Sequence, residues 1–207
     1  MNCFCYLFSF LLLFITCGCA SVPYRYGTNR SYGKYPTMKS GEPQFEYGKP
    51  NSIVDGIGRL FSIPSKIILW DRRVDNHSIS DETLLKLKIY LMTNGLEEVK
   101  VRVNQYDPIG ELKRTVDNLS IGIIWRYTGG LVTWLYYTLL PGRIFGGDNY
   151  NPFSHTINLY SDVPEIALHE GAHAKDFTNR KYRGTYAFLG LIPVSYTHLT
   201  LPTIYSV

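Results

Sequence analysis

The chain has 207 residues, 45% of them hydrophobic, and its 21 Lys and Arg against 17 Asp and Glu give a formal net charge of +4. This length and composition are sufficient for one domain with a buried core. The basic residues are spread along the chain and form no block of the kind that follows a phosphate backbone. Nucleic acid is therefore not expected as a partner.

The chain begins with an apolar run that is typical of a signal-peptide core and too short for a comfortable membrane span with polar flanks. Its end, TCGCASV, resembles a bacterial lipoprotein processing site, which implies cleavage after Gly18 and lipid attachment to Cys19. No Lys or Arg precedes the run and Thr16 stands where such sites usually carry Leu, so an ordinary secretory signal or an uncleaved anchor is the alternative. We expect a lipoprotein-type signal peptide at residues 1–18.

This expectation places the protein in the bacterial cell envelope, on the periplasmic or extracytoplasmic face, with the lipid membrane as a partner through Cys19. In either case the mature chain keeps at most one cysteine, because every cysteine lies among the first nineteen residues. Neither a disulfide framework nor a cysteine-based metal site is therefore expected.

Residues 19–51 are rich in Tyr, Gly, Ser, Pro and Lys and show no helical or strand periodicity. This composition predicts a flexible tether between the membrane and the domain. The alternative is that its tyrosines and basic residues contact glycan or peptidoglycan. The folded domain is predicted to occupy residues 52–193.

Four segments predict the strands and helices in the first part of this domain. KIILW (66–70) has strand character. SISDETLLKLKIYLMTNG (78–95) predicts a helix with a Ser cap, an acidic first turn and a broad buried face. VKVRVNQY (99–106) alternates as a half-buried strand does, and DPIGELKRTVDN (107–118) predicts a short helix. This order indicates an α+β or α/β subdomain.

Residues 119–141 are the most apolar part of the mature chain, but Arg126 and the pair Gly129-Gly130 interrupt them. The unbroken stretch of residues 131–140 is too short to span a bilayer. A buried helical hairpin is predicted, and an interfacial patch that dips into the membrane is the alternative.

Turn residues follow in GGDNYNP (146–152), which lacks the fingerprint of a phosphate-binding loop. HTINLY (155–160) then predicts a strand. A strand in this position can form the rim of a cleft where an extended peptide adds by edge pairing.

The next segment, SDVPEIALHEGAHAKDF (161–177), predicts a helix that starts near Val163, because Asp162 can cap it and Pro164 suits a first turn. His169 and His173 are four residues apart and share one face of this helix, so both imidazoles can reach a single ion. The spacing makes them candidate zinc ligands.

Glu170 lies one residue round the helix, where its carboxylate can take a proton from water that zinc has acidified to a pKa of about 7. The residues ALHEGAHA resemble the active helix of the zincin metallopeptidases over about fifteen residues. The resemblance implies that His169 and His173 bind Zn²⁺ and that Glu170 is the general base and proton shuttle in peptide hydrolysis.

The third ligand is not evident. The metzincin pattern requires Gly and His where this chain has Asp176 and Asn179, so that branch is excluded. A gluzincin-like site takes a Glu from a later helix, but residues 177–207 contain no Asp or Glu. Asp176 lies a further turn along the helix and is predicted to orient a ligand rather than to bind. His155 is a weak candidate.

His198 remains, but VSYTHLTLPT (194–203) resembles a translation of the transposon-end adapter used for sequencing libraries. Residues 194–207 are therefore expected to be an adapter-derived tail, with the third ligand missing from a truncated site. The sequence thus predicts an α+β fold, a small zincin-like domain with a mixed sheet and a peptide or protein substrate. The alternative is a non-enzymatic envelope lipoprotein whose histidine pair is structural or vestigial.

Overall fold

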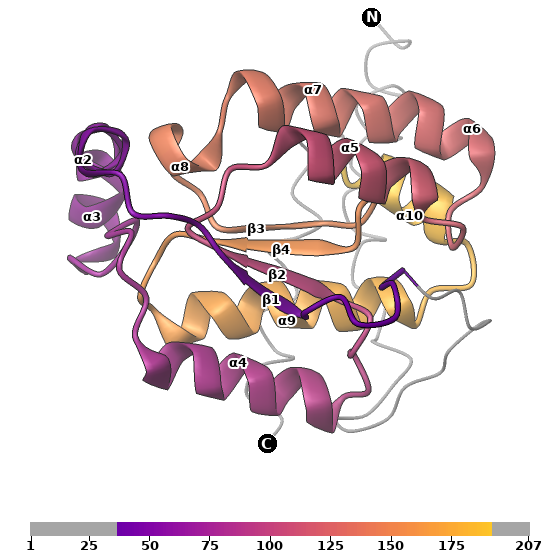
Figure 1. Ribbon diagram of the computed structural model, residues 1–207, viewed down its shortest axis with the longest axis horizontal. Coiled ribbons are helices and arrows are strands. Elements are labelled where there is room, and N and C mark those ends of the chain that lie inside the picture. Colours follow the sequence, from indigo (N-terminus) through magenta and orange to yellow (C-terminus); the bar gives the residue numbers. More distant parts are fainter. Residues whose placement is uncertain (1–36, 192–207) are drawn as a thin grey trace, which may run out of the picture.

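The computed structural model describes residues 37–191, so the signal peptide predicted at 1–18, Cys19 and the tail at 194–207 lie outside the described residues. The described chain has an α+β fold around one mixed four-stranded sheet, with the strand order β1-β2-β4-β3. Helices cover both faces of this sheet (Figure 1). The α+β class predicted from the sequence is confirmed at this level.

Three parallel strands and one antiparallel strand form the sheet. The parallel strands are β1 (Phe45–Tyr47), β2 (Lys100–Val103) and β4 (Thr156–Leu159), and β3 (Asn149–Asn151) runs antiparallel to β4. The strand predicted at 155–160 is confirmed, but β4 pairs with β2 on one side and β3 on the other. It therefore has no free edge for a peptide, and the edge on this side of the sheet belongs to β3.

One face of the sheet is apolar and packs against α4 (Asp81–Thr93) and α9 (Pro164–Thr178). Both helices run along this face in Figure 1. The helix predicted at 78–95 is confirmed as α4, with its N-cap at Ser80. Its buried stripe is narrower than expected, because only the residues that meet the sheet and α9 are covered. The core of this layer consists of Leu84, Leu87, Leu91, Leu96, Val99, Val101, Val103, Ile157, Leu159, Ala167 and Ala174.

The other face of the sheet is polar, and α5 (Pro108–Asp117) covers it together with α7 (Leu131–Leu139). Lys100 and Arg102 point to this side and are fully buried. The Arg102 guanidinium lies 2.8 Å from the Glu111 carboxylate, and the Lys100 ammonium lies 3.0 Å from Glu42. The strand predicted at 99–106 is therefore confirmed, but its half-burial is wrong, because ion pairs allow its polar side to be covered as well.

The folded domain begins before Ser52. Thr37 donates from its backbone N–H to the Glu98 carboxylate at 2.7 Å, and Phe45 pairs with Val101 in the sheet. Residues 37–51 therefore do not belong to the tether predicted for residues 19–51. The short strand β1 was missed because its stabilising contacts come from residues more than fifty positions away in the chain.

The strand predicted at 66–70 is wrong. This segment belongs to α3 (Ile63–Leu69), which follows α2 (Ser52–Phe61) at one end of the sheet (Figure 1). A short apolar run does not distinguish a strand from a helix, and Pro64 in the first turn favours the helix. The side chains of α3 are largely exposed, so this segment is not part of the core.

The buried hairpin predicted at 119–141 is also wrong. The helix α6 (Ile123–Trp125) continues through a π-helical turn, η1 (Arg126–Gly130), into α7 without reversing direction. Gly129 and Gly130 lie inside this run, where a Cβ on Gly129 would come within 2.6 Å of the Phe153 ring. The glycines thus allow close packing and make no turn. Across residues 37–191, no helix is both long and apolar enough to cross a bilayer.

Candidate metal centre

The helix α9 begins with Pro164 in its first turn, and its N-cap residue, Val163, makes no side-chain capping bond. The predicted helix is confirmed, but its predicted cap is wrong. The Asp162 carboxylate instead accepts the backbone N–H of Ser80 at 2.9 Å and the hydroxyl of Thr83 at 2.7 Å. Asp162 therefore joins the first turn of α4 to the start of α9.

Small residues let α9 lie close to α4 and the sheet. Gly171 faces α4, where a Cβ would lie 3.0 Å from Tyr90 and 3.3 Å from Leu87. Ala167 and Ala174 are buried in the apolar core between the helix and the sheet. Because this side of α9 is fixed by packing, the orientation of the opposite side is fixed too.

His169 and His173 converge on one point. Their Nε2 atoms are 2.9 Å apart, the two rings stand at 81° to each other, and both side chains are half-buried. Zn–N bonds of about 2.0 Å in a tetrahedral site separate two ligand nitrogens by about 3.3 Å. The pair therefore fits two positions of a zinc site after a shift of a few tenths of an ångström.

Glu170 points away from solvent toward the edge strand β3. Its side chain is 7% exposed and accepts a hydrogen bond from the backbone N–H of Tyr150. Burial raises the pKa of Glu170 well above its usual value, and the Asp148 carboxylate raises it further. The residue next to the histidine pair in sequence is thus a buried carboxyl group that holds a proton more readily than an exposed one.

Asp176 is buried one turn beyond His173. Its carboxylate accepts two hydrogen bonds from Arg180, at 2.8 and 2.9 Å, and one from the hydroxyl of Tyr186 on α10 (Arg183–Leu189). Asp176 therefore joins α9 to α10. Its predicted role of orienting a metal ligand stays a prediction. The spacing of four residues indicates the pair with Arg180, whereas no sequence signal marks Tyr186.

His155 lies in the core. Its Nδ1 is 2.6 Å from the Tyr150 hydroxyl, and its ring packs against Phe177. Burial lowers the pKa of His155 to about 3. In the part of the chain that the structure describes, no three His, Cys, Asp or Glu residues form a group that could hold a metal, so His155 does not complete the pair. His198 lies outside the described residues.

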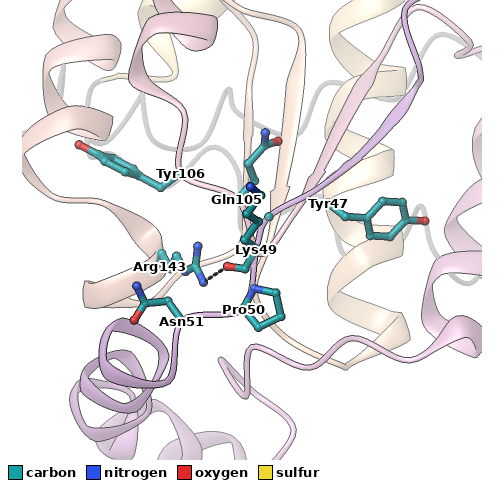
Figure 2. Close-up of a pocket in the computed structure, with 8 residues that line it drawn as sticks. Tyr47, Lys49, Pro50, Asn51, Gln105, Tyr106 and Arg143 are labelled. Atoms are coloured by element: carbon teal, nitrogen blue, oxygen red, sulfur yellow. Dashed lines mark hydrogen bonds between the residues drawn. The ribbon is translucent and has the colours of Figure 1, made fainter.

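A separate hollow of about 430 Å³ opens at the carboxyl ends of β1 and β2 (Figure 2). Its lining comes from the segments that follow these strands and from Arg143, whose guanidinium donates to the Lys49 carbonyl at 2.8 Å. None of the residues that line it belongs to α9. No sequence pattern predicted this hollow, and it contributes no group to the candidate metal centre.

No protein-family model, curated protein or solved structure matches this chain.

Proposed function

We propose that this chain is a zinc-dependent metallopeptidase that hydrolyses peptide bonds in the bacterial envelope. One observation carries the proposal: His169 and His173 bring their Nε2 atoms within 2.9 Å of each other on a packed helix, with Glu170 between them in sequence. A helix that carries two converging imidazoles and an adjacent carboxyl group suits hydrolysis assisted by a metal.

In this proposal His169 and His173 hold the zinc ion. Zinc would supply a Lewis acid that acidifies water and polarises the peptide carbonyl. Glu170 takes the proton from the attacking water and passes it to the departing amine, so it acts first as a base and then as an acid. Its burial suits this shuttle, because a raised pKa makes the carboxylate a stronger base for the proton of water.

The third ligand is proposed to come from a residue outside those described, since the described residues provide no third metal-binding side chain beside the pair. The anchoring lipid is proposed to be attached to Cys19, in line with the processing site TCGCASV. A catalytic domain held in this way would meet peptide or protein substrates at the membrane surface.

The test compares Glu170→Gln with a matched control, Glu165→Gln, in the full chain. Glu165 is on the same helix but is exposed in its first turn. Zinc content is measured by mass spectrometry, and hydrolysis with a mixture of fluorogenic peptides. Glu170→Gln should retain zinc and lose about 10²–10⁴-fold in rate, whereas Glu165→Gln should change neither quantity.

Two further variants, His169→Ala and His173→Ala, should each lose zinc as well as activity. If the natural chain binds no zinc and cleaves no peptide, the alternative becomes the better conclusion. The protein would then be a non-enzymatic envelope lipoprotein whose histidine pair is structural or vestigial. Hydrolysis that is unchanged in Glu170→Gln would disprove the assignment of the base.

A further inference from the structure

The second feature that suggests a function is an apolar surface far along the chain from α9. Large side chains of α2 and α3 point to solvent, from Ile57 at 41% exposed to Ile68 at 77% and Trp70 at 93%. Soluble proteins rarely expose so much contiguous apolar area without a partner. This α2–α3 surface consists of Ile53, Ile57, Leu60, Phe61, Ile63, Ile67, Ile68, Leu69 and Trp70.

Trp70 is held outward by an uncommon backbone conformation. It ends α3 with φ at 50° and ψ at 30°, in the left-handed region that large side chains seldom adopt. Glycine is the usual residue at such a helix end. Backbone strain of this kind is typical of functional sites, so the strained and exposed Trp70 favours a partner that binds its indole ring.

The exposed charges around this surface are positive. Arg59, Arg72 and Arg73 are exposed beside it. Asp55 is buried against Arg143 at 2.8 Å and Asp71 pairs with Arg73 at 2.8 Å, which leaves the charges of Arg59 and Arg72 for the rim. Aliphatic side chains, an exposed indole and a cationic rim together match the boundary between headgroups and acyl chains of an anionic bilayer.

We propose that the α2–α3 surface docks onto an anionic lipid bilayer, with Trp70 and the isoleucines of α3 inserted below the headgroups and Arg59 and Arg72 against them. The helices lie on the membrane and do not span it, since α2 has ten residues and α3 has seven. This contact is distinct from a lipid at Cys19 and does not depend on the peptidase proposal.

The test uses the full chain reconstituted into vesicles that carry brominated acyl chains, which quench only inserted indoles. Vesicles of phosphatidylcholine alone are compared with vesicles that also contain phosphatidylglycerol. The emission of Trp70 is obtained by subtracting the emission of the Trp70→Phe variant from that of the natural chain. This subtraction removes the emission of Trp125 and Trp134. Quenching and a blue shift of the Trp70 emission are expected, and both should be stronger with phosphatidylglycerol.

The double variant Ile67→Glu/Ile68→Glu should lose the quenching of Trp70. Ile89→Glu is the matched control, because Ile89 on α4 is also exposed and apolar but lies outside the surface. Every variant keeps the N-terminal apolar run, so any loss reports this surface alone. Arg59→Glu/Arg72→Glu should remove the preference for phosphatidylglycerol.

Two results would overturn the proposal. The first is a Trp70 emission that brominated lipids leave unchanged in both kinds of vesicle. The second is a dimer in detergent, measured by light scattering, that Ile67→Glu/Ile68→Glu dissociates and Ile89→Glu does not. That outcome would assign the surface to a second copy of the chain.

Discussion

On the face of the sheet toward α4 and α9, the strands present Val101 and Ile157, whereas toward α5 they present Lys100 and Arg102. Both faces are covered by helices, and the side chains on both are buried. The apolar face is held by close packing, and the polar face by ion pairs and hydrogen bonds. Alternation of apolar and polar residues along a strand therefore reports the chemistry of its two faces and not their exposure.

The two faces should also respond differently to mutation. On the apolar face, removing a side chain leaves a cavity whose cost depends on its size. On the polar face, removing one partner leaves a charge buried without compensation, which is costly whatever the size of the side chain. Three measurements test this difference.

The largest effect is expected from Glu111→Ala. Glu111 accepts hydrogen bonds from Arg102 at 2.8 Å and from Asn151 at 2.7 Å. Its loss takes the nearest carboxylate from a buried guanidinium and leaves only the longer contacts with Asp107 at 3.5 Å and Glu46 at 3.8 Å. The free energy of unfolding, measured in urea, should fall by about 3–5 kcal/mol.

Glu82→Ala is its control, because the ion pair of Glu82 with Lys86 is exposed and its loss should leave the free energy of unfolding almost unchanged. The double variant Arg102→Met/Glu111→Leu should be destabilised less than Glu111→Ala, since it removes both charges. A double variant that is less stable than the single one would contradict the view that the buried charge is the main cost.

On the apolar face, Leu87→Ala should lower the free energy of unfolding by about 2–5 kcal/mol, because Leu87 is fully buried between α4 and the sheet. Leu85→Ala on the same helix is the comparison, since Leu85 is exposed and its loss should change stability by less than about 0.5 kcal/mol. Equal losses in the two variants would mean that α4 does not pack as described.

The smallest effect concerns His155, a titratable residue that lies on the α9 side of the sheet against Phe177. Burial lowers its pKa from 6.5 to about 3, so the folded chain holds it neutral while the unfolded chain protonates it. The neutral state of His155 therefore has no effect on the free energy of unfolding above pH 6.5. As the pH falls from 6.5 toward about 3, this free energy decreases by up to about 1.4 kcal/mol per pH unit.

His155→Asn should remove this part of the pH dependence, and asparagine tolerates the left-handed backbone at this position, where φ is 55°. Urea unfolding of both chains between pH 7 and pH 4 measures the difference. Identical pH profiles would show that folding does not lower the pKa of His155.

The sequence predicted those elements whose signals are local. The helix α4 has its Ser cap and acidic first turn, α9 has its proline, and β2 and β4 have apolar residues with strand propensity. The elements that were missed depend on pairing with other strands. The strands β1 and β3 have three residues each, and β3 consists of Asn149, Tyr150 and Asn151, two of which favour turns in isolation. Only pairing with β2 and β4 makes them strands.

The candidate site could be predicted in part. Spacing alone placed His169 and His173 on one side of a helix, and the structure brings their Nε2 atoms together. Spacing gave no information on burial, so the position of Glu170 against β3 and the contact of Asp176 with Tyr186 could not be foreseen. Both depend on which elements pack against α9, which is a property of the whole fold.

The contacts made by the first described residues have a mechanical consequence. Glu98 accepts the backbone N–H groups of Thr37 and Met38, at 2.7 and 2.8 Å, just before β2, and β1 then pairs with β2 in parallel. A pull on the chain from its N-terminal side would load these contacts first and then draw β1 along β2. In that shear geometry the backbone hydrogen bonds of the two strands bear the force together. The edge of the sheet would therefore resist the pull before the force reached the helix that carries the histidines.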